Sequence, residues 1–169
     1  MKFYKKSLGQ NFLKDKNIVR KILDLTKIDG KDIVEIGPGK GALTDEILRK
    51  KPKSLTLLEK DSELAKYLHE KYSLYGKIKI HNTDVLRFNF ETLKKKKLIL
   101  IGNLPYNISS QILIKLLKIK NIDLKISDLV LMFQKELGER IIAKYPAKHY
   151  GRLSIIAGLN LKKINKFFV

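Results

Sequence analysis

Short apolar runs along the chain alternate with stretches in which apolar residues recur every three or four positions. Ile18, Ile22 and Leu25 have that helical spacing and predict a helix over residues 15–26. Short runs rich in apolar residues, which predict strands, lie at residues 33–36, 55–59, 78–80, 98–101 and 129–133. Helical patterns follow four of these runs, at residues 43–48, 64–72, 112–117 and 137–142. The residues from Gly151 onward fit neither pattern uniquely.

This alternation of strands and helices predicts an α/β protein with a mostly parallel sheet. Each helix carries the chain back to the edge where the next strand begins, so that right-handed crossovers cover both faces of the sheet. Neither an internal repeat nor an interdomain linker interrupts the pattern, and 169 residues with 44% hydrophobic content can bury one core. We therefore expect one Rossmann-like globular unit over residues 1–169, which begins with a polar arm at residues 1–14.

The charge balance favours a polyanionic partner. Lys and Arg number 36 against 17 Asp and Glu, giving a formal net charge of +19, and such a surplus attracts phosphates and releases their counterions. Nucleic acid is therefore the leading partner class. Only five of the basic residues are Arg, however, and a Lys-rich composition is also typical of a genome-wide bias.

Composition also excludes several classes of protein. Cysteine is absent, which excludes disulfides and thiolate metal sites. His69, His81 and His149 are dispersed without a paired ligand spacing, so the sequence predicts no metal site. The longest apolar run, residues 129–133, is too short to span a bilayer, and no apolar stretch follows the charged start. We expect a cytoplasmic monomer without a membrane partner.

A glycine-rich loop follows the first predicted strand, with the pattern Glu35-x-Gly37-x-Gly39-x-Gly41. Glycines let the backbone approach a ligand and turn tightly into a helix, and in a doubly wound sheet this loop belongs to the ligand-binding edge. Glu59 ends the second strand, 22 residues after Gly37, where a carboxylate can accept hydrogen bonds from both ribose hydroxyls of a nucleoside. The alternatives are a plain tight turn with a surface acid, or a dinucleotide fingerprint, whose third glycine would come one residue later.

Two further segments follow the third and fourth predicted strands. Asp84 comes after the third strand, where its carboxylate could accept the adenine amine of a bound nucleoside cofactor; a turn residue is the alternative. The run Asn103-Leu104-Pro105-Tyr106 closes the fourth strand. Its alternative is a proline turn in which Tyr106 only covers the edge of the core.

The run from Asn103 to Tyr106 suits the exocyclic amine of adenine. The lone pair of that amine is delocalised into the ring, so a site must accept its hydrogens and localise the pair. Asn103 can offer its side-chain oxygen and Leu104 its backbone carbonyl, whose direction Pro105 restricts. Tyr106 supplies a face on which a flipped base can stack. The segment therefore predicts a catalytic adenine site that needs no general base.

Three motifs together resemble the KsgA-type ribosomal RNA adenine dimethyltransferases, and the resemblance runs along the whole chain. They are the glycine loop at residues 35–39, the segment 103–108 and the opening run Gly-Gln-Asn-Phe-Leu at residues 9–13. Residues 132–136 and 150–154 resemble the small-subunit branch rather than the antibiotic-resistance enzymes that act on large-subunit RNA. The resemblance implies S-adenosylmethionine (SAM) as cofactor. It also implies dimethylation of N6 of two adjacent adenines in the 3′-terminal hairpin of small-subunit (16S) RNA, during ribosome biogenesis.

The resemblance also implies roles for individual residues. By position, SAM contacts would come from Asn11, Leu13, Gly37, Gly39, Glu59, Asp84 and Asn103, and target-adenine contacts from Asn103, Leu104, Pro105 and Tyr106. Family members continue beyond this point with a final strand and a small helical domain, so we expect both to be missing from this chain. Two alternatives stay open: a large-subunit adenine methyltransferase of the resistance type, and a non-catalytic RNA-binding assembly factor.

Overall fold

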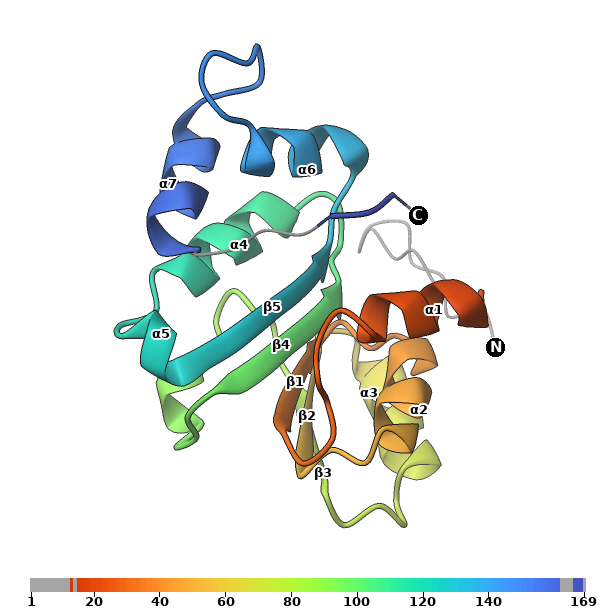
Figure 1. The fold of residues 1–169 in the computed structure, drawn as a ribbon. Coiled ribbons are helices and arrows are strands. Elements are labelled where there is room, and N and C mark those ends of the chain that lie inside the picture. Colours follow the sequence, from red (N-terminus) through yellow and green to blue (C-terminus); the bar gives the residue numbers. More distant parts are fainter. Residues whose placement is uncertain (1–12, 14, 162–165, 169) are drawn as a thin grey trace.

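The computed structural model describes residues 13, 15–161 and 166–168, which form a parallel sheet between helices (Figure 1). The five strands lie in the order β3-β2-β1-β4-β5, and every neighbouring pair is parallel. Their bounds are β1 (Asp32–Ile36), β2 (Ser54–Glu59), β3 (Ile78–Asn82), β4 (Leu98–Asn103) and β5 (Ile126–Met132). The predicted α/β class and parallel sheet are confirmed.

The helices include the five that the sequence predicts, with bounds close to the expected ones, and others that it does not predict. They are α1 (Lys16–Leu23), α2 (Ala42–Arg49), α3 (Ser62–Lys71), α4 (Ser109–Leu117), the short α5 (Ile122–Lys125), α6 (Lys135–Ile142) and α7 (Arg152–Asn160), with a 3₁₀ turn, η2 (Phe90–Thr92). Aspartate caps two of them: Asp15 accepts from the Asn17 amide and Asp61 from the Glu63 amide. Residues 152–160, in the region that fits neither pattern uniquely, form α7.

One boundary differs from the expectation. The fifth strand begins at Ile126, three residues before the apolar run at 129–133, because Ser127 and Asp128 are part of it. Both side chains are exposed, and β5 is the last strand of the described sheet, so one of its edges has no neighbouring strand there. An edge strand tolerates polar residues that an inner strand excludes. The apolar pattern therefore did not detect the first residues of β5.

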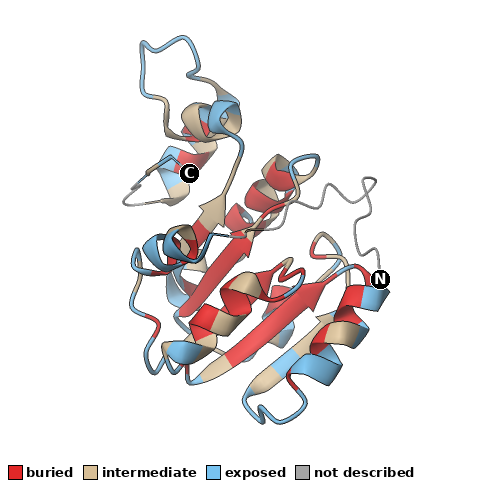
Figure 2. Cartoon of the chain, turned by 90° about the vertical axis from the view of Figure 1, so that its right-hand side faces the viewer, coloured by how far each residue is buried: buried red, intermediate tan, exposed pale blue. Residues whose placement is uncertain are grey.

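Two apolar clusters lie on opposite faces of the sheet. Neighbouring residues alternate between them, so that Ile33 packs with α1 and α2 on one face and Val34 with α4 on the other. A third cluster joins α6 and α7 to α4. Figure 2 shows the strands buried between these layers. Among the described residues, the helices are too short or too polar to cross a bilayer.

Strand order creates a switch point between β1 and β4. The chain runs outward from β1 to β2 and β3, and then returns to the other side of β1 for β4 and β5. Loops that leave the carboxyl ends of β1 and β4 therefore diverge, and ligands of such sheets bind in the resulting crevice. The glycine loop and the run from Asn103 to Tyr106 are those two loops.

Gly102 keeps these two strands close, and we expect its replacement to destabilise the fold. A Cβ at Gly102 would lie 2.8 Å from the Ile36 carbonyl oxygen and 3.1 Å from Leu104 Cδ2. Gly102→Ala should lower the free energy of unfolding in urea by about 1–3 kcal/mol. Gly138→Ala, in α6 with open space around it, should instead be neutral or raise it by up to about 1 kcal/mol. Equal stability of Gly102→Ala and wild type would contradict the close approach.

Candidate active site

The carboxyl edge of the sheet brings most of the predicted site residues together. Gly37 and Gly39 follow β1, Glu59 ends β2, Asp84 follows β3, and Asn103 ends β4. Because the strand order is β3-β2-β1-β4, these residues form a row along one edge. The sequence prediction that they share an edge is confirmed, whereas Asn11 lies outside the described residues.

The glycine loop has a backbone that other residues rarely adopt. Gly37, Gly39 and Gly41 have φ values of +66°, +59° and +85°. A Cβ at Gly41 would also overlap the Tyr72 hydroxyl, which donates a 2.7 Å hydrogen bond to Asp45. This alternation of left-handed glycines turns the chain from β1 into α2, and positions 37, 39 and 41 present no side chain.

Glu59 fixes the glycine loop to the end of β2. Its Oε2 accepts a 3.1 Å hydrogen bond from the Gly39 amide, and its Oε1 accepts one of 2.9 Å from the Asp61 amide. The side chain is almost completely buried, and burial raises its pKa, while these two backbone donors oppose that shift. Each carboxylate oxygen can accept a second hydrogen bond, so Glu59 retains capacity for a ligand's donors.

Asp84 is paired with a lysine from the neighbouring strand end. Lys60 Nζ lies 2.9 Å from Asp84 Oδ2, and the Leu86 amide donates to Oδ1 at 2.9 Å. The hydrogen bond from Lys60 is the main cause that holds the Asp84 pKa below its ordinary value, so the carboxylate is ionised at neutral pH. Asn82 ties the same two strands, because its amide donates to the Glu59 carbonyl at 3.0 Å.

Glu35 is a buried carboxyl at the start of the glycine loop. Its Oε2 accepts a 2.7 Å hydrogen bond from Thr44 Oγ1 of α2, whereas its Oε1 has no hydrogen-bond partner among the described residues. Burial raises the pKa of Glu35 to about 8, against the opposing effect of the Thr44 hydrogen bond. At neutral pH the group is therefore mostly protonated, and it joins β1 to α2 across the loop.

This buried carboxyl predicts a pH-dependent stability that Glu35→Gln should remove. Its folded-state pKa is raised from 4.5 to about 8, so the stabilisation is fully present below pH 4.5 and is lost as the pH rises through 8. At about 1.36 kcal/mol per pKa unit, the loss is roughly 5 kcal/mol. Urea unfolding of both proteins at acidic and alkaline pH measures it. The free energy of unfolding of Glu35→Gln, relative to that of wild type, should increase with pH. Parallel pH profiles of the two proteins would contradict the raised pKa of Glu35.

The loop after β4 holds one side chain inward and one outward. Asn103 pairs with Met132 of β5 and lies beside the glycine loop, since a Cβ on Gly37 would be 3.8 Å from the Asn103 carbonyl oxygen. Leu104 is buried in the core on the α4 face, while Tyr106 is 41% exposed. The Tyr106 carbonyl accepts a 3.1 Å hydrogen bond from Ser109, a buried residue at the start of α4. The Tyr106 ring is thus presented from a fixed backbone.

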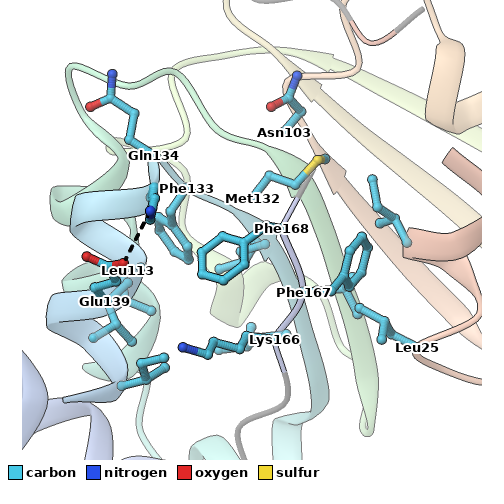
Figure 3. A pocket seen from close by; sticks show the side chains of 18 of the residues that line it. Leu25, Asn103, Leu113, Met132, Phe133, Gln134, Glu139, Lys166, Phe167 and Phe168 are labelled. Atoms are coloured by element: carbon cyan, nitrogen blue, oxygen red, sulfur yellow. Dashed lines mark ion pairs between the residues drawn. The ribbon is translucent and has the colours of Figure 1, made fainter. Parts of the chain in front are cut away.

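A cavity of about 880 Å³ opens beside this loop. Leu13, Asn103 and Tyr106 line it together with β5, α6 and residues 166–168, whereas Gly37, Glu59 and Asp84 lie farther along the edge. Figure 3 shows the amides of Asn103 and Gln134 at the same end of the cavity. The sequence predicted no role for Gln134. The only feature that pointed to a place in the site was its position directly after a predicted buried strand.

Solved structures that this fold resembles include methyltransferases. The described structure resembles a dimethyladenosine transferase from Plasmodium falciparum with a TM-score of 0.77 and 32% identity, covering 88% of this chain and 52% of that one. It also resembles the 23S rRNA methyltransferase ErmE with a TM-score of 0.69 and 28% identity, covering 80% of this chain and 52% of the other.

Sequence comparison narrows the class to a family. Residues 1–163 match the family described as ribosomal RNA adenine dimethylase, and the chain belongs to that family. The Ribosomal RNA small subunit methyltransferase A of Pelagibacter ubique is 49% identical over 162 residues, which cover 95% of this chain and 61% of that protein. The chain thus spans about three-fifths of the length of that curated relative.

Proposed function

We propose that this protein dimethylates N6 of two adjacent adenines in the 3′-terminal hairpin of small-subunit ribosomal RNA, with SAM as methyl donor. The observation that carries the proposal is the loop from Asn103 to Tyr106, which leaves β4 beside the glycine loop at the switch point of the sheet. Family membership supports an adenine target, and the small-subunit enzyme of Pelagibacter ubique, at 49% identity, supports the small subunit. The likeness to the 23S enzyme is weaker, at 28% identity.

The residues at the sheet edge fit a nucleoside cofactor. Gly37 and Gly39 present no side chain to a ligand, Glu59 has spare acceptor capacity for a ribose diol, and Asp84 is an ionised acceptor for an adenine amine. Leu13 and Asn103 share the neighbouring cavity, where the reacting end of the cofactor would meet the target base. We assign SAM to this row, with Asn11 as a further contact predicted from the resemblance alone.

The protein's own contribution to the reaction is orientation and hydrogen bonding. When bound, SAM supplies a sulfonium methyl group, which the adenine amine accepts with loss of one proton and release of S-adenosylhomocysteine. Asn103 and the Leu104 carbonyl accept the two amine hydrogens and direct the nitrogen lone pair, with Pro105 fixing the backbone. The Tyr106 ring stacks on the flipped base. Because these acceptors and the stacking hold the adenine in a reactive orientation, the reaction needs no side chain that acts as a general base.

Residues 1–169 would form the catalytic domain of this enzyme, with residues 1–14 as an arm, in a cytoplasmic protein that acts as a monomer on immature small subunits. The net charge of +19 supports an RNA partner. A non-catalytic assembly factor is the less favoured function, because Gly37, Glu59, Asp84 and Asn103 are all present.

Replacing Tyr106 tests the proposed base-stacking role. Tyr106→Ala should lower the rate of methyl transfer to RNA about tenfold or more, because one base–aromatic stack contributes roughly 1–3 kcal/mol. Affinity for SAM, measured by calorimetry, should stay within about twofold, since only base stacking is lost. Tyr106→Phe keeps the ring and should retain most of the rate. Unchanged transfer by Tyr106→Ala would remove the residue from the site.

A further inference from the structure

We propose that the loop at residues 144–150, between α6 and α7, is a second RNA contact on which Tyr145 and Tyr150 stack against an unpaired base of the substrate. The proposal rests on the proposed function, because it takes the RNA substrate as given. It concerns a surface separate from the Asn103–Tyr106 loop and from the cavity, whose lining residues do not include the loop.

Two tyrosine rings meet on this loop and remain in solvent. Tyr145 is 82% exposed and Tyr150 is 40% exposed, and their rings form an edge-to-face pair with centroids 6.1 Å apart. A single exposed tyrosine requires no explanation. Two exposed rings in contact present neighbouring aromatic faces to solvent, and unpaired bases stack on such faces.

The loop is held in shape rather than merely exposed. The Ala147 amide donates to the Lys144 carbonyl at 2.8 Å, and the Tyr150 amide donates to the Ala147 carbonyl at 2.9 Å, so two consecutive turns shape it. The helices that flank it, α6 and α7, are joined by buried Ser154, whose hydroxyl donates to the Arg140 carbonyl at 2.6 Å. A surface ordered before binding loses less conformational entropy when a ligand arrives.

The charges around the pair match a phosphate backbone. Glu139 is the last acidic residue of the sequence, and the loop carries Lys144, Lys148 and His149. All three are exposed, and no carboxylate among the described residues forms an ion pair with either lysine. Lysines attract any polyanion, including an anionic membrane, whereas interleaved lysines and paired aromatic rings are typical of single-stranded RNA surfaces.

The loop lies on the same side of the molecule as the proposed base-binding site. Figures 1 and 2 show it projecting beyond α6 and α7, away from the core of the sheet. Helix α6 begins directly after Gln134, which shares the cavity with Asn103, and its eight residues lead to the loop. That helix is roughly 12 Å long, so RNA with its target base at Asn103 can extend along α6 to the tyrosines.

The test compares RNA affinity of the double variant Tyr145→Ala/Tyr150→Ala with that of wild type. The probe is fluorescently labelled small-subunit RNA that lacks adenine methylation, titrated at each of several salt concentrations. We expect the double variant to bind about tenfold more weakly, with unchanged SAM affinity, since stacking of one base contributes about 1–3 kcal/mol. Tyr145→Phe, which keeps the ring, should bind like wild type. Lys144→Gln/Lys148→Gln should reduce the slope of affinity against salt by roughly two.

Tyr75→Ala is the matched control. Tyr75 is 52% exposed and also forms an edge-to-face pair, with Tyr72 at 6.0 Å, but it lies between α3 and β3 at the opposite edge of the sheet. It should leave RNA affinity unchanged. Wild-type RNA affinity in the double tyrosine variant would overturn the loop proposal alone, as would a loss confined to binding of phosphatidylglycerol vesicles. Failure of wild type to bind the RNA would instead overturn the proposed function, and the loop proposal with it.

Discussion

Asn103→Ala is expected to lower methyl transfer by a factor on the order of 10² to 10³, the range for removing one placed hydrogen-bonding group from a reacting centre. Asn103 closes β4 and lines the cavity, and its backbone carbonyl lies beside the glycine loop, so the residue is positioned between the proposed cofactor and base sites. Without its oxygen, one amine hydrogen of the target adenine loses its acceptor. Single-turnover transfer of labelled methyl groups to unmethylated RNA measures the effect.

A matched asparagine separates this role from general damage. Asn160 ends α7, and its side-chain amide donates to the Ile156 carbonyl at 2.8 Å. It is not among the residues at the carboxyl edge of the sheet. Asn160→Ala should retain full transfer, and Asn103→Ala should keep the thermal midpoint of wild type within a few degrees. Transfer by Asn103→Ala at more than about a third of the wild-type rate would exclude Asn103 as the amine acceptor. Even a tenfold loss corresponds to only about 1.4 kcal/mol, so a smaller loss is too little for a lost hydrogen bond at the reacting centre.

Glu59→Ala should weaken SAM binding by about 10- to 100-fold. Hydrogen bonds to a charged group contribute about 1.5–3 kcal/mol, and the substitution removes the proposed acceptor of the ribose hydroxyls. It also frees the Gly39 amide, to which Glu59 is bound at 3.1 Å, and so loosens the glycine loop. Calorimetric titration with SAM, at a temperature where both proteins are folded, gives the ratio of affinities.

Glu63→Ala provides the comparison for that titration. Glu63 is an exposed acid in the first turn of α3, four residues after Glu59, so the variant removes the same charge from the same region. Its SAM affinity should remain within about twofold of wild type, because Glu63 lies outside the row of site residues. Equal affinities of Glu59→Ala and Glu63→Ala would assign Glu59 to the fold rather than to the cofactor.

The sequence predicted the inner part of this fold well because its strands are buried on both faces. The strands β1, β2 and β4 are rich in apolar residues for that reason, and the pattern located each of them. The start of β5 was missed because Ser127 and Asp128 are exposed at the edge. Helix α7 was ambiguous because apolar residues occur around much of its circumference, and α6 and α4, distant in sequence, decide which of them are buried.

The site was predictable where a residue's role follows from its place at a strand end. Glu59 and Asn103 each close a strand, so a parallel sheet alone brings them to one edge. The contacts that hold the site were not predictable, because they join residues through packing. Thr44 to Glu35 and Lys60 to Asp84 are such pairs, and neither has a motif of its own. The part that α6 plays in the cavity, through Gln134, likewise required the structure.

The most direct test of the proposed activity is to incubate the protein and SAM with small ribosomal subunits that lack adenine methylation, and to map N6,N6-dimethyladenosine by mass spectrometry of RNA fragments. The Asn103→Ala variant serves as the control. We predict two dimethylated adenines, adjacent to each other in the 3′-terminal hairpin, formed by wild type and lost in the variant. Product at other positions of the RNA, equal product from both proteins, or no product from wild type would contradict the proposed activity.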